Sequence, residues 1–266
     1  MPDPVVLVAR EGGVATITLN RPQALNALNR ELTLGLLQNL SSVESDQTVR
    51  CVVVRGGEHF MAGGDLKWFR SLAEGSSPAE NRAQFAGFIE EAHALILALR
   101  RMPKPVIAAV RGAVAGFGMS LMMASDLVLA ADNAYFTLAY TLIGVSPDGG
   151  STFALPRIVG QKKAMEIALL GERFDAAAAE RLGLVNRVVP KERLEEETAR
   201  LAARLASGPT AVYARTKALL GGSLNSSLEA QLQREAEAFA QSASEPDFLE
   251  GLAAFIEKRT PRFTGR

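Results

Sequence analysis

The sequence has little of the side-chain chemistry on which several protein classes depend. Among its 266 residues are one cysteine, Cys51, and two histidines, His59 and His93. A single cysteine excludes an intramolecular disulfide and a multi-cysteine metal site, and two histidines leave little for a zinc centre. We therefore expect a protein of a reducing compartment that binds no metal.

Long apolar runs and an excess of one charge are also missing. No stretch approaches the roughly 20 apolar residues of a membrane span, and the first ten residues lack the pattern of a secretory signal. Lys+Arg and Asp+Glu both number 29, so the formal net charge is zero. Such a balance gives no bulk attraction to nucleic acid or to an anionic membrane. The expectation is a cytoplasmic protein with neither kind of partner.

The rest of the composition is typical of a globular chain that alternates strands and helices in its first half. The segments Val5–Ala9 and Val14–Leu19 predict a hairpin around two glycines. The apolar runs Cys51–Arg55 and Pro105–Val110 predict strands buried on both faces, with a helix over Ala79–Arg101 between them. Further short strands are expected at Leu127–Ala130, Tyr135–Thr137 and Leu184–Val189. This order favours an α/β fold with a mostly parallel sheet.

The second half has the periodicity of helices. From Gln161 onward the sequence is rich in Ala, Leu, Glu and Arg, with breaks at glycine and proline. We predict an α/β core over residues 1–190 and a helical C-terminal region over 191–266. That region would pack on its own core or reach a neighbouring subunit.

Two glycine-rich junctions each follow a strand that we predict to be buried. The first, Phe60–Leu66, holds Gly63-Gly64 and then Asp65, which is placed to cap a helix. The second, Gly112–Ser120, leads into another helix. Free N–H groups at such helix starts could bind one oxyanion from two sides, although tight structural turns are an alternative. Neither junction matches a nucleotide-binding glycine motif.

Four runs together resemble the enoyl-CoA hydratase/isomerase (crotonase) superfamily. They are Asn20–Leu28, Phe60–Leu66, Lys104–Gly112 and Phe255–Arg259. The resemblance implies a ββα spiral core with a C-terminal helical region that mediates trimerisation, in a homotrimer or a hexamer built as a dimer of trimers. It also implies an acyl-CoA thioester as substrate, with coenzyme A as part of that substrate and no separate cofactor.

The resemblance also implies roles for individual residues. The backbone N–H groups of Gly64 and Phe117 would hold the thioester carbonyl as it becomes an enolate. Phe255 and Lys258 would help to bind coenzyme A, often across a subunit interface, although an ordinary exposed lysine is an alternative for Lys258. The other residues implied at the substrate and coenzyme A site are Ala24, Leu25, Ala27, Ala62, Asp65, Leu66 and Gly116.

The chain departs from the hydratases at two positions. Hydratases of this superfamily use two glutamates to add water to a double bond, and Ser120 and Tyr140 stand at those positions here. Neither is a good base at neutral pH, so the usual two-glutamate hydration is not expected. Both residues remain candidates for holding substrate or water.

A single carboxylate is available at another turn. Asp148 lies in Ser146–Ser151, which is similar to the turn that carries one acid in Δ3-Δ2-enoyl-CoA isomerases and ring-epoxyphenylacetyl-CoA isomerases. One carboxylate could take a proton from C2 and return it to C4, and an apolar pocket would raise its pKa. Pro-Asp-Gly is also a favourable turn sequence in itself.

Other candidates receive structural interpretations. We predict His59 in a loop, His93 as a packed or surface residue, and Asp126 as a cap or ion-pair partner. Four aromatic residues line the acyl pocket or belong to the core: Trp68, Phe69, Phe85 and Phe88. Our first hypothesis is therefore an enoyl-CoA isomerase with Asp148 as base. The alternatives are a hydratase or lyase with water held by Ser120, Tyr140 or Asp148, and a non-catalytic acyl-CoA-binding homologue.

Overall fold

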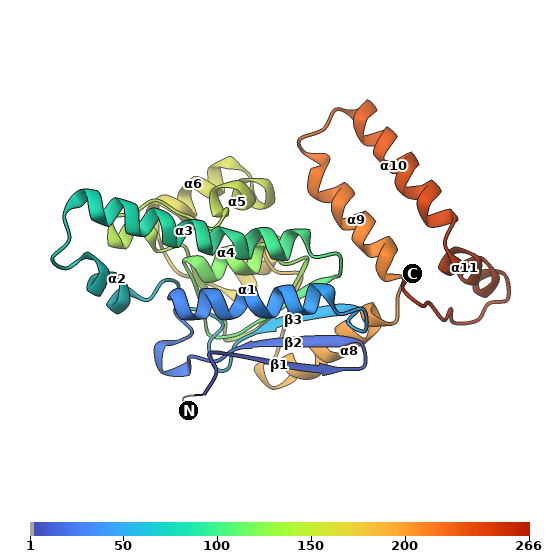
Figure 1. Cartoon of the computed structure of the whole chain (residues 1–266), viewed down its shortest axis with the longest axis horizontal. Coiled ribbons are helices and arrows are strands. Elements are labelled where there is room, and N and C mark those ends of the chain that lie inside the picture. The colour runs from blue at the N-terminus through green and yellow to red at the C-terminus, as the bar shows by residue number, and fades with distance from the viewer. Residues whose placement is uncertain (1–2) are drawn as a thin grey trace.

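A six-stranded sheet forms the centre of the structure, a computed structural model that describes residues 3–266 (Figure 1). Its strands in spatial order are β1 (Val6–Glu11), β2 (Val14–Leu19), β3 (Cys51–Arg55), β4 (Val106–Val110), β6 (Leu127–Ala131) and β9 (Arg187–Val189). The β1–β2 pair is antiparallel and every other neighbouring pair is parallel. Strands β3 and β4 are almost wholly buried, since helices cover both faces of a parallel sheet. The predicted mostly parallel sheet is confirmed.

The first two strands form the predicted hairpin. Val14 pairs with Glu11, and Gly12 and Gly13 between them both have positive φ, at 56° and 79°. Two-residue hairpin loops favour glycine because this backbone region is strained for other residues. The hairpin closes one edge of the sheet and leads into the first helix.

Helices α1 (Arg30–Ser45) and α3 (Pro78–Arg101) pack against each other over one face of the sheet. In α1 the buried residues recur at helical spacing, at Leu32, Leu36, Leu40 and Val43. Helix α3 begins with a capping box in which the Ser77 side chain accepts from the Glu80 N–H and Glu80 accepts from the Ser77 N–H. This fixes where the long helix starts.

Helix α8 (Leu194–Ala206) covers the other face of the sheet. Its Leu194, Ala202 and Ala206 are buried against β3, β4 and β6. The division predicted at residue 191 therefore separates α8 from the sheet that it covers. Apolar helical periodicity is the same whether a helix packs on its own sheet or on a partner, so the pattern could not place this boundary.

A smaller sheet holds the segments around the glycine-rich junctions. It consists of β5 (Ala113–Ala115), β7 (Tyr135–Thr137) and β8 (Phe174–Asp175). Strand β5 lies inside the second junction, where only a turn was predicted. The surrounding helices are α2 (Leu66–Ala73), α4 (Phe117–Met123), α5 (Ser151–Val159), α6 (Gln161–Leu170) and α7 (Ala176–Arg181), with short 3-10 helices η1 (Pro22–Ala24), η2 (Tyr140–Ile143) and η3 (Lys191–Arg193). Helix α4 is entirely buried.

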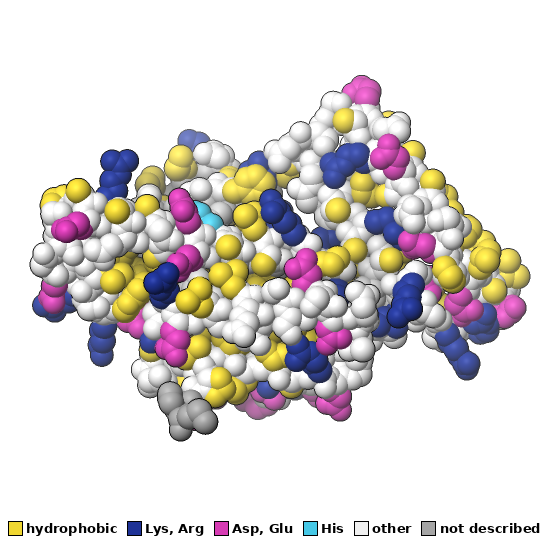
Figure 2. All heavy atoms as spheres, viewed as in Figure 1, with side chains coloured by type: hydrophobic (Ala, Val, Ile, Leu, Met, Phe, Trp, Pro, Cys, Tyr) yellow, Lys and Arg dark blue, Asp and Glu magenta, His cyan; other side chains and the backbone are white. Residues whose placement is uncertain are grey.

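The last three helices extend away from the core, as Figure 1 shows: α9 (Thr210–Ser223), α10 (Leu228–Ala243) and α11 (Pro246–Ile256). Several polar contacts tie this arm to the core. Lys217 Nζ lies 2.8 Å from Asp126 Oδ2, and Arg50 donates to the Phe263 carbonyl at 3.1 Å. Asp126 thus pairs structurally, as predicted. Many large apolar side chains of this arm are exposed, among them Phe239 and Phe255 (Figure 2). Across residues 3–266, no helix combines the length and apolarity that crossing a membrane requires.

Candidate active site

The largest described cavity, of about 890 Å³, lies between the two glycine junctions, helices α2 and α3, and the segment that follows β7. Seven predicted site residues line it: Ala62, Gly64, Leu66, Gly116, Phe117, Tyr140 and Asp148. Phe69, Phe85 and Phe88 also line it, and the ring of Phe69 meets each of the other two edge to face. Trp68 packs behind them against Phe88, with ring centroids 4.7 Å apart. The cavity is therefore mostly apolar, with one carboxylate, Asp148, among its lining side chains.

The two glycine junctions meet side by side at one wall of this cavity. The Met61 N–H donates to the Ala113 carbonyl at 3.0 Å, and the Ala115 N–H donates back to the Met61 carbonyl at 2.9 Å. Beyond this ladder Gly63 faces Gly116, where φ is +50° and a Cβ would lie 3.4 Å from the Gly63 Cα. Glycine is needed here because the two backbones approach so closely.

The junctions leave two backbone donors free. Gly64 lies within the first junction and Phe117 begins α4, and both residues line the cavity. Within the part of the chain that the structure describes, neither N–H has a hydrogen-bond acceptor. Backbone donors beside an apolar cavity normally find a partner, so two free donors on one wall mark a place for a ligand oxygen.

Asp148 lines the same cavity from a turn that is held at several atoms. The Tyr140 hydroxyl donates to Asp148 Oδ1 at 2.5 Å. The Asp148 carbonyl accepts from the hydroxyls of Ser120 at 3.1 Å and Ser151 at 2.8 Å. The other carboxylate oxygen, Oδ2, has no partner among residues 3–266. The carboxylate is thus fixed through one oxygen and available through the other.

Burial sets the charge states of this pair. It raises the pKa of Asp148, and the hydrogen bond from Tyr140 and the nearby His93 act in the opposite direction. Burial, followed by the charge of Asp148, raises the pKa of Tyr140 far above that of an ordinary phenol. Tyr140 therefore stays a hydrogen-bond donor, and Asp148 is the group of the pair that can exchange a proton.

Ser120 lies outside the cavity lining, contrary to the expectation that it holds substrate. It is 1% exposed beneath the Asp148 turn. Because its hydroxyl donates to the Asp148 carbonyl, Ser120 supports the turn from behind. The position matched to a hydratase glutamate is occupied here by a side chain that binds the protein's own backbone.

The loop around Leu25 borders the cavity without lining it. Ala24, Leu25 and Ala27 lie next to the first junction, where the Ala62 N–H donates to the Leu25 carbonyl at 3.0 Å. Asp65 caps α2 by accepting from the Trp68 N–H, and it pairs with Arg21 at 2.9 Å. Its carboxylate is thus already bound within the chain. The loop is positioned for a ligand that extends out of the cavity, while Asp65 holds the loop to α2.

Phe255 and Lys258 lie at the far end of the C-terminal arm. Phe255 is 86% exposed, and neither residue lines the cavity of its own chain. In Figure 1, α11 and the helices of the cavity are at opposite ends of the molecule. The expected contact with coenzyme A stays a prediction, and with these positions it would involve the cavity of a second subunit.

His93 is the residue whose place the sequence did not predict. It is on the surface, as expected, but this surface is the cavity wall, and its Nε2 accepts from the Gly149 N–H at 3.2 Å. Phe85, Ile89 and His93 follow one another at intervals of four in α3, and all three line the cavity. That spacing was the available signal, because it places side chains on one helix face. His59 is structural, and its Nδ1 accepts from the Ala113 N–H at 3.0 Å.

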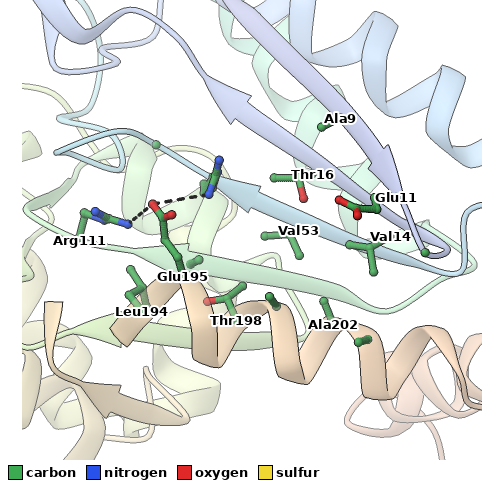
Figure 3. A pocket seen from close by; sticks show the side chains of 16 residues that line it. Ala9, Glu11, Val14, Thr16, Val53, Arg111, Leu194, Glu195, Thr198 and Ala202 are labelled. Atoms are coloured by element: carbon green, nitrogen blue, oxygen red, sulfur yellow. Dashed lines mark hydrogen bonds and ion pairs between the residues drawn. The ribbon is translucent and has the colours of Figure 1, made fainter. Parts of the chain in front are cut away.

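A second cavity, of about 420 Å³, lies between α8 and the first four strands (Figure 3). Glu195 lies 2.9 Å from Arg111 and 3.7 Å from Arg55 at one end of it. Glu195 pairs with both arginines, Glu11 is the other charged residue of the lining, and the remaining lining is largely small and apolar. In the described chain, no group of three His, Cys, Asp or Glu side chains is arranged to hold a metal. The chemistry-bearing groups converge in the larger cavity.

Comparisons with known proteins agree with this arrangement. Residues 9–266 match the family model described as enoyl-CoA hydratase/isomerase. The chain is 37% identical over 257 residues to 1,2-epoxyphenylacetyl-CoA isomerase of Escherichia coli, which covers 96% of this chain and 97% of that protein. It is 40% identical over 255 residues to a protein of Rhodobacter capsulatus named as an enoyl-CoA hydratase, covering 96% and 95%. A crystal structure of an enoyl-CoA hydratase/isomerase from Mycobacterium abscessus superposes with a TM-score of 0.92 at 33% identity, covering 98% of this chain and 100% of that one.

Proposed function

Because the chain belongs to the enoyl-CoA hydratase/isomerase family, we propose that it is an acyl-CoA isomerase in which Asp148 carries a proton from one carbon to another. The observation that carries the proposal is the position of Asp148. It lines an apolar cavity with one carboxylate oxygen held by Tyr140, and the same cavity is lined by two residues, Gly64 and Phe117, whose backbone N–H groups are free in the described chain. Coenzyme A would enter as part of the substrate.

The reaction would proceed through an enolate. Asp148 removes a proton from C2 of a 3-enoyl thioester, and the electron pair of that C–H bond moves toward the carbonyl oxygen. The N–H groups of Gly64 and Phe117 stabilise the oxygen as it becomes negative, each worth on the order of 100- to 1000-fold in rate. Protonated Asp148 then returns the proton to C4, which leaves the double bond between C2 and C3. The reaction adds no water and involves no oxidation or reduction.

The raised pKa of Asp148 suits both halves of this cycle. A carboxylate with an ordinary pKa is a weak base and gives up its proton too readily to deliver it to a chosen carbon. Burial in the cavity brings the pKa closer to the operating pH, where general acid and base catalysis are both efficient. One residue can then serve in both directions.

Hydration is the second candidate, favoured by the relative from Rhodobacter capsulatus that is named as a hydratase. A water molecule held by Tyr140 and activated by Asp148 would have to replace the usual pair of glutamates. Asp148 is the one carboxylate of the cavity lining, so the same residue would also have to protonate the neighbouring carbon. The isomerase needs no second acid–base group, and we therefore prefer it.

We further propose that the exposed apolar arm assembles the chain into a trimer or a dimer of trimers. Contiguous exposed apolar side chains such as those of α10 and α11 mark protein–protein contacts. In such an assembly Phe255 and Lys258 would reach the coenzyme A of a neighbouring subunit. Analytical ultracentrifugation tests the assembly, and Phe255→Asp should shift it toward the monomer.

Paired substrates test the reaction itself. Matched 3-enoyl- and 2-enoyl-CoA thioesters are incubated with the enzyme in D2O and analysed by mass spectrometry. We expect double-bond migration without addition of water, with deuterium entering at C2 or C4 only as far as protonated Asp148 exchanges with the solvent. Asp148→Asn should slow it by about 100- to 10,000-fold. Asp175→Asn is the matched control, because Asp175 caps α7 outside the cavity and Asn can also cap.

Two outcomes would contradict this proposal. Addition of water to the 2-enoyl substrate without migration of the 3-enoyl bond would identify a hydratase. Thioester binding measured by calorimetry, without turnover across a panel of acyl groups, would identify a non-catalytic acyl-CoA-binding homologue.

A further inference from the structure

The peptide group that joins Asp148 to Gly149 is hydrogen-bonded at both of its polar ends. Its carbonyl accepts from Ser120 and Ser151, and its N–H donates to His93 Nε2 at 3.2 Å. Gly149 has a φ of +59°, and a Cβ there would lie 2.6 Å from the Ser120 Cβ. The turn therefore lies close against α4 on one side and is anchored to α3 on the other.

The anchor on α3 differs from the other two because its acceptor can be protonated. Only the unprotonated Nε2 of an imidazole accepts a hydrogen bond, so the contact requires neutral His93 with its proton on Nδ1. Ser120 and Ser151 do not change charge at accessible pH. His93 is exposed at the cavity wall, so its ring is accessible to solvent.

We propose that His93 is a positioning residue for Asp148 and acts only when its imidazole is neutral. Protonation of Nε2 replaces an acceptor with a donor that points at the Gly149 N–H, which breaks the contact and releases the turn. This inference rests on the proposed role of Asp148. It makes activity depend on a second ionisation, that of His93, although His93 does not touch the reacting atoms.

Few other charges act on this imidazole. The titratable or charged groups on the elements that border it are Asp148, Tyr140, Arg70 paired with Glu74, Glu90 on its own helix, and Glu91 paired with Arg30. Asp148 is the nearest of these along the hydrogen-bonded turn, and a charged imidazole would favour its carboxylate form. Protonated His93 thus lowers the pKa of Asp148 while removing its anchor, so the loss of activity that it causes would come from lost geometry.

The contact can be observed without catalysis. Asp148-Gly149 is the single Asp-Gly pair in the sequence. Labelling with carbonyl-13C aspartate and 15N-glycine therefore gives one amide resonance, that of Gly149. The two histidines are followed in the same titration through 13C-labelled rings. In Asp148→Asn, labelled with carbonyl-13C asparagine, the neighbouring carboxylate cannot titrate. We expect the Gly149 amide to shift there with the midpoint of His93.

Kinetics then connect the contact to the reaction. His93→Gln places an amide oxygen where Nε2 was, so it should keep kcat within about threefold and remove one of two ionisations from the acid limb of the pH profile. His93→Leu has no acceptor and should lower kcat by about 100-fold at every pH with little change in KM, as expected for a misplaced catalytic group. His59→Asn is the control. The Asn side-chain oxygen can replace His59 Nδ1 as acceptor for the Ala113 N–H, so the pH profile should not change.

Two results would overturn the inference. One is a Gly149 resonance that does not follow His93 in the Asp148→Asn protein. The other is equal activity and equal pH profiles for His93→Gln and His93→Leu. Absence of isomerase activity in the wild-type protein would refute the proposed function instead, and the resonance measurement would still decide whether His93 holds the turn.

Discussion

The Tyr140 hydroxyl donates a hydrogen bond of 2.5 Å to Oδ1 of Asp148, eight residues further along the chain. Tyr140 begins the 3-10 helix after β7, and Asp148 lies in the turn before α5. The bond therefore closes the loop between them over the cavity. It orients the carboxylate so that one oxygen is bound to the protein and the other is free for a substrate proton.

Tyr140→Phe should move the acid limb of kcat/KM to higher pH. The phenol lowers the pKa of Asp148 by stabilising its charged form. Without the phenol, the effect of burial dominates further and the pKa of Asp148 rises. A larger fraction of Asp148 would then be protonated and unable to act as base at a given pH. The pH dependence of kcat/KM measures this. Tyr135→Phe in β7, outside the cavity, should leave the limb in place. An unshifted limb in Tyr140→Phe would show that the bond does not control the carboxylate.

Asp148→Asn should stabilise the fold at neutral pH. The pKa of Asp148 is higher in the folded than in the unfolded chain, so the folded state binds more protons between the two values. The stabilising contribution of the protonated carboxyl is fully present below the unfolded value, about 3.9, and is lost as pH rises through the folded value. Asn carries no charge and still accepts from Tyr140. The gain in melting temperature should therefore be clear at pH 7 and fade toward pH 4, and a gain that grows toward pH 4 would contradict it.

Gly149→Ala should destabilise the turn by about 3 kcal/mol or more, through backbone strain and a clash. The positive φ disfavours any side chain, and the new Cβ would lie 2.6 Å from the Ser120 Cβ. Gly75→Ala separates the two causes, because φ there is +80° and nothing lies within 4 Å of its Cβ position. We expect about 1 kcal/mol for this variant in urea unfolding. Equal costs would show that the Asp148 turn is not tightly packed on α4.

Leu194→Ala should lower the free energy of unfolding by about 2–5 kcal/mol, as for other buried leucines. Leu194 is 1% exposed at the start of α8 and packs against the sheet. Leu34→Ala in α1 is the control, since Leu34 is 49% exposed and should cost far less. Chemical denaturation measures both. A small effect at Leu194 would indicate that α8 contributes little to the core and belongs with the C-terminal region, as the sequence had suggested.

Local patterns predicted much of this protein. Continuous apolar runs predicted β3 and β4, paired glycines predicted the β1–β2 turn, and the helix over 79–101 is α3 almost to the residue. These features depend on residues close together in the sequence. Their backbone preferences and the spacing of their apolar side chains determine the local structure. The resemblance also predicted seven residues that line one cavity, from the two glycine junctions, from Tyr140 and from the turn around Asp148.

Tertiary structure decided the rest, because it concerns contacts between segments far apart in the sequence. His93 lies 56 residues from Gly149, and only the crossing of α3 over the turn makes its ring an acceptor there. Ser120 lies behind Asp148 because α4 is buried, and α8 belongs to the sheet because its apolar stripe finds a face left uncovered by α1 and α3. Helical spacing fixes which side chains share a face, but the surface opposite that face is fixed only when the chain closes on itself.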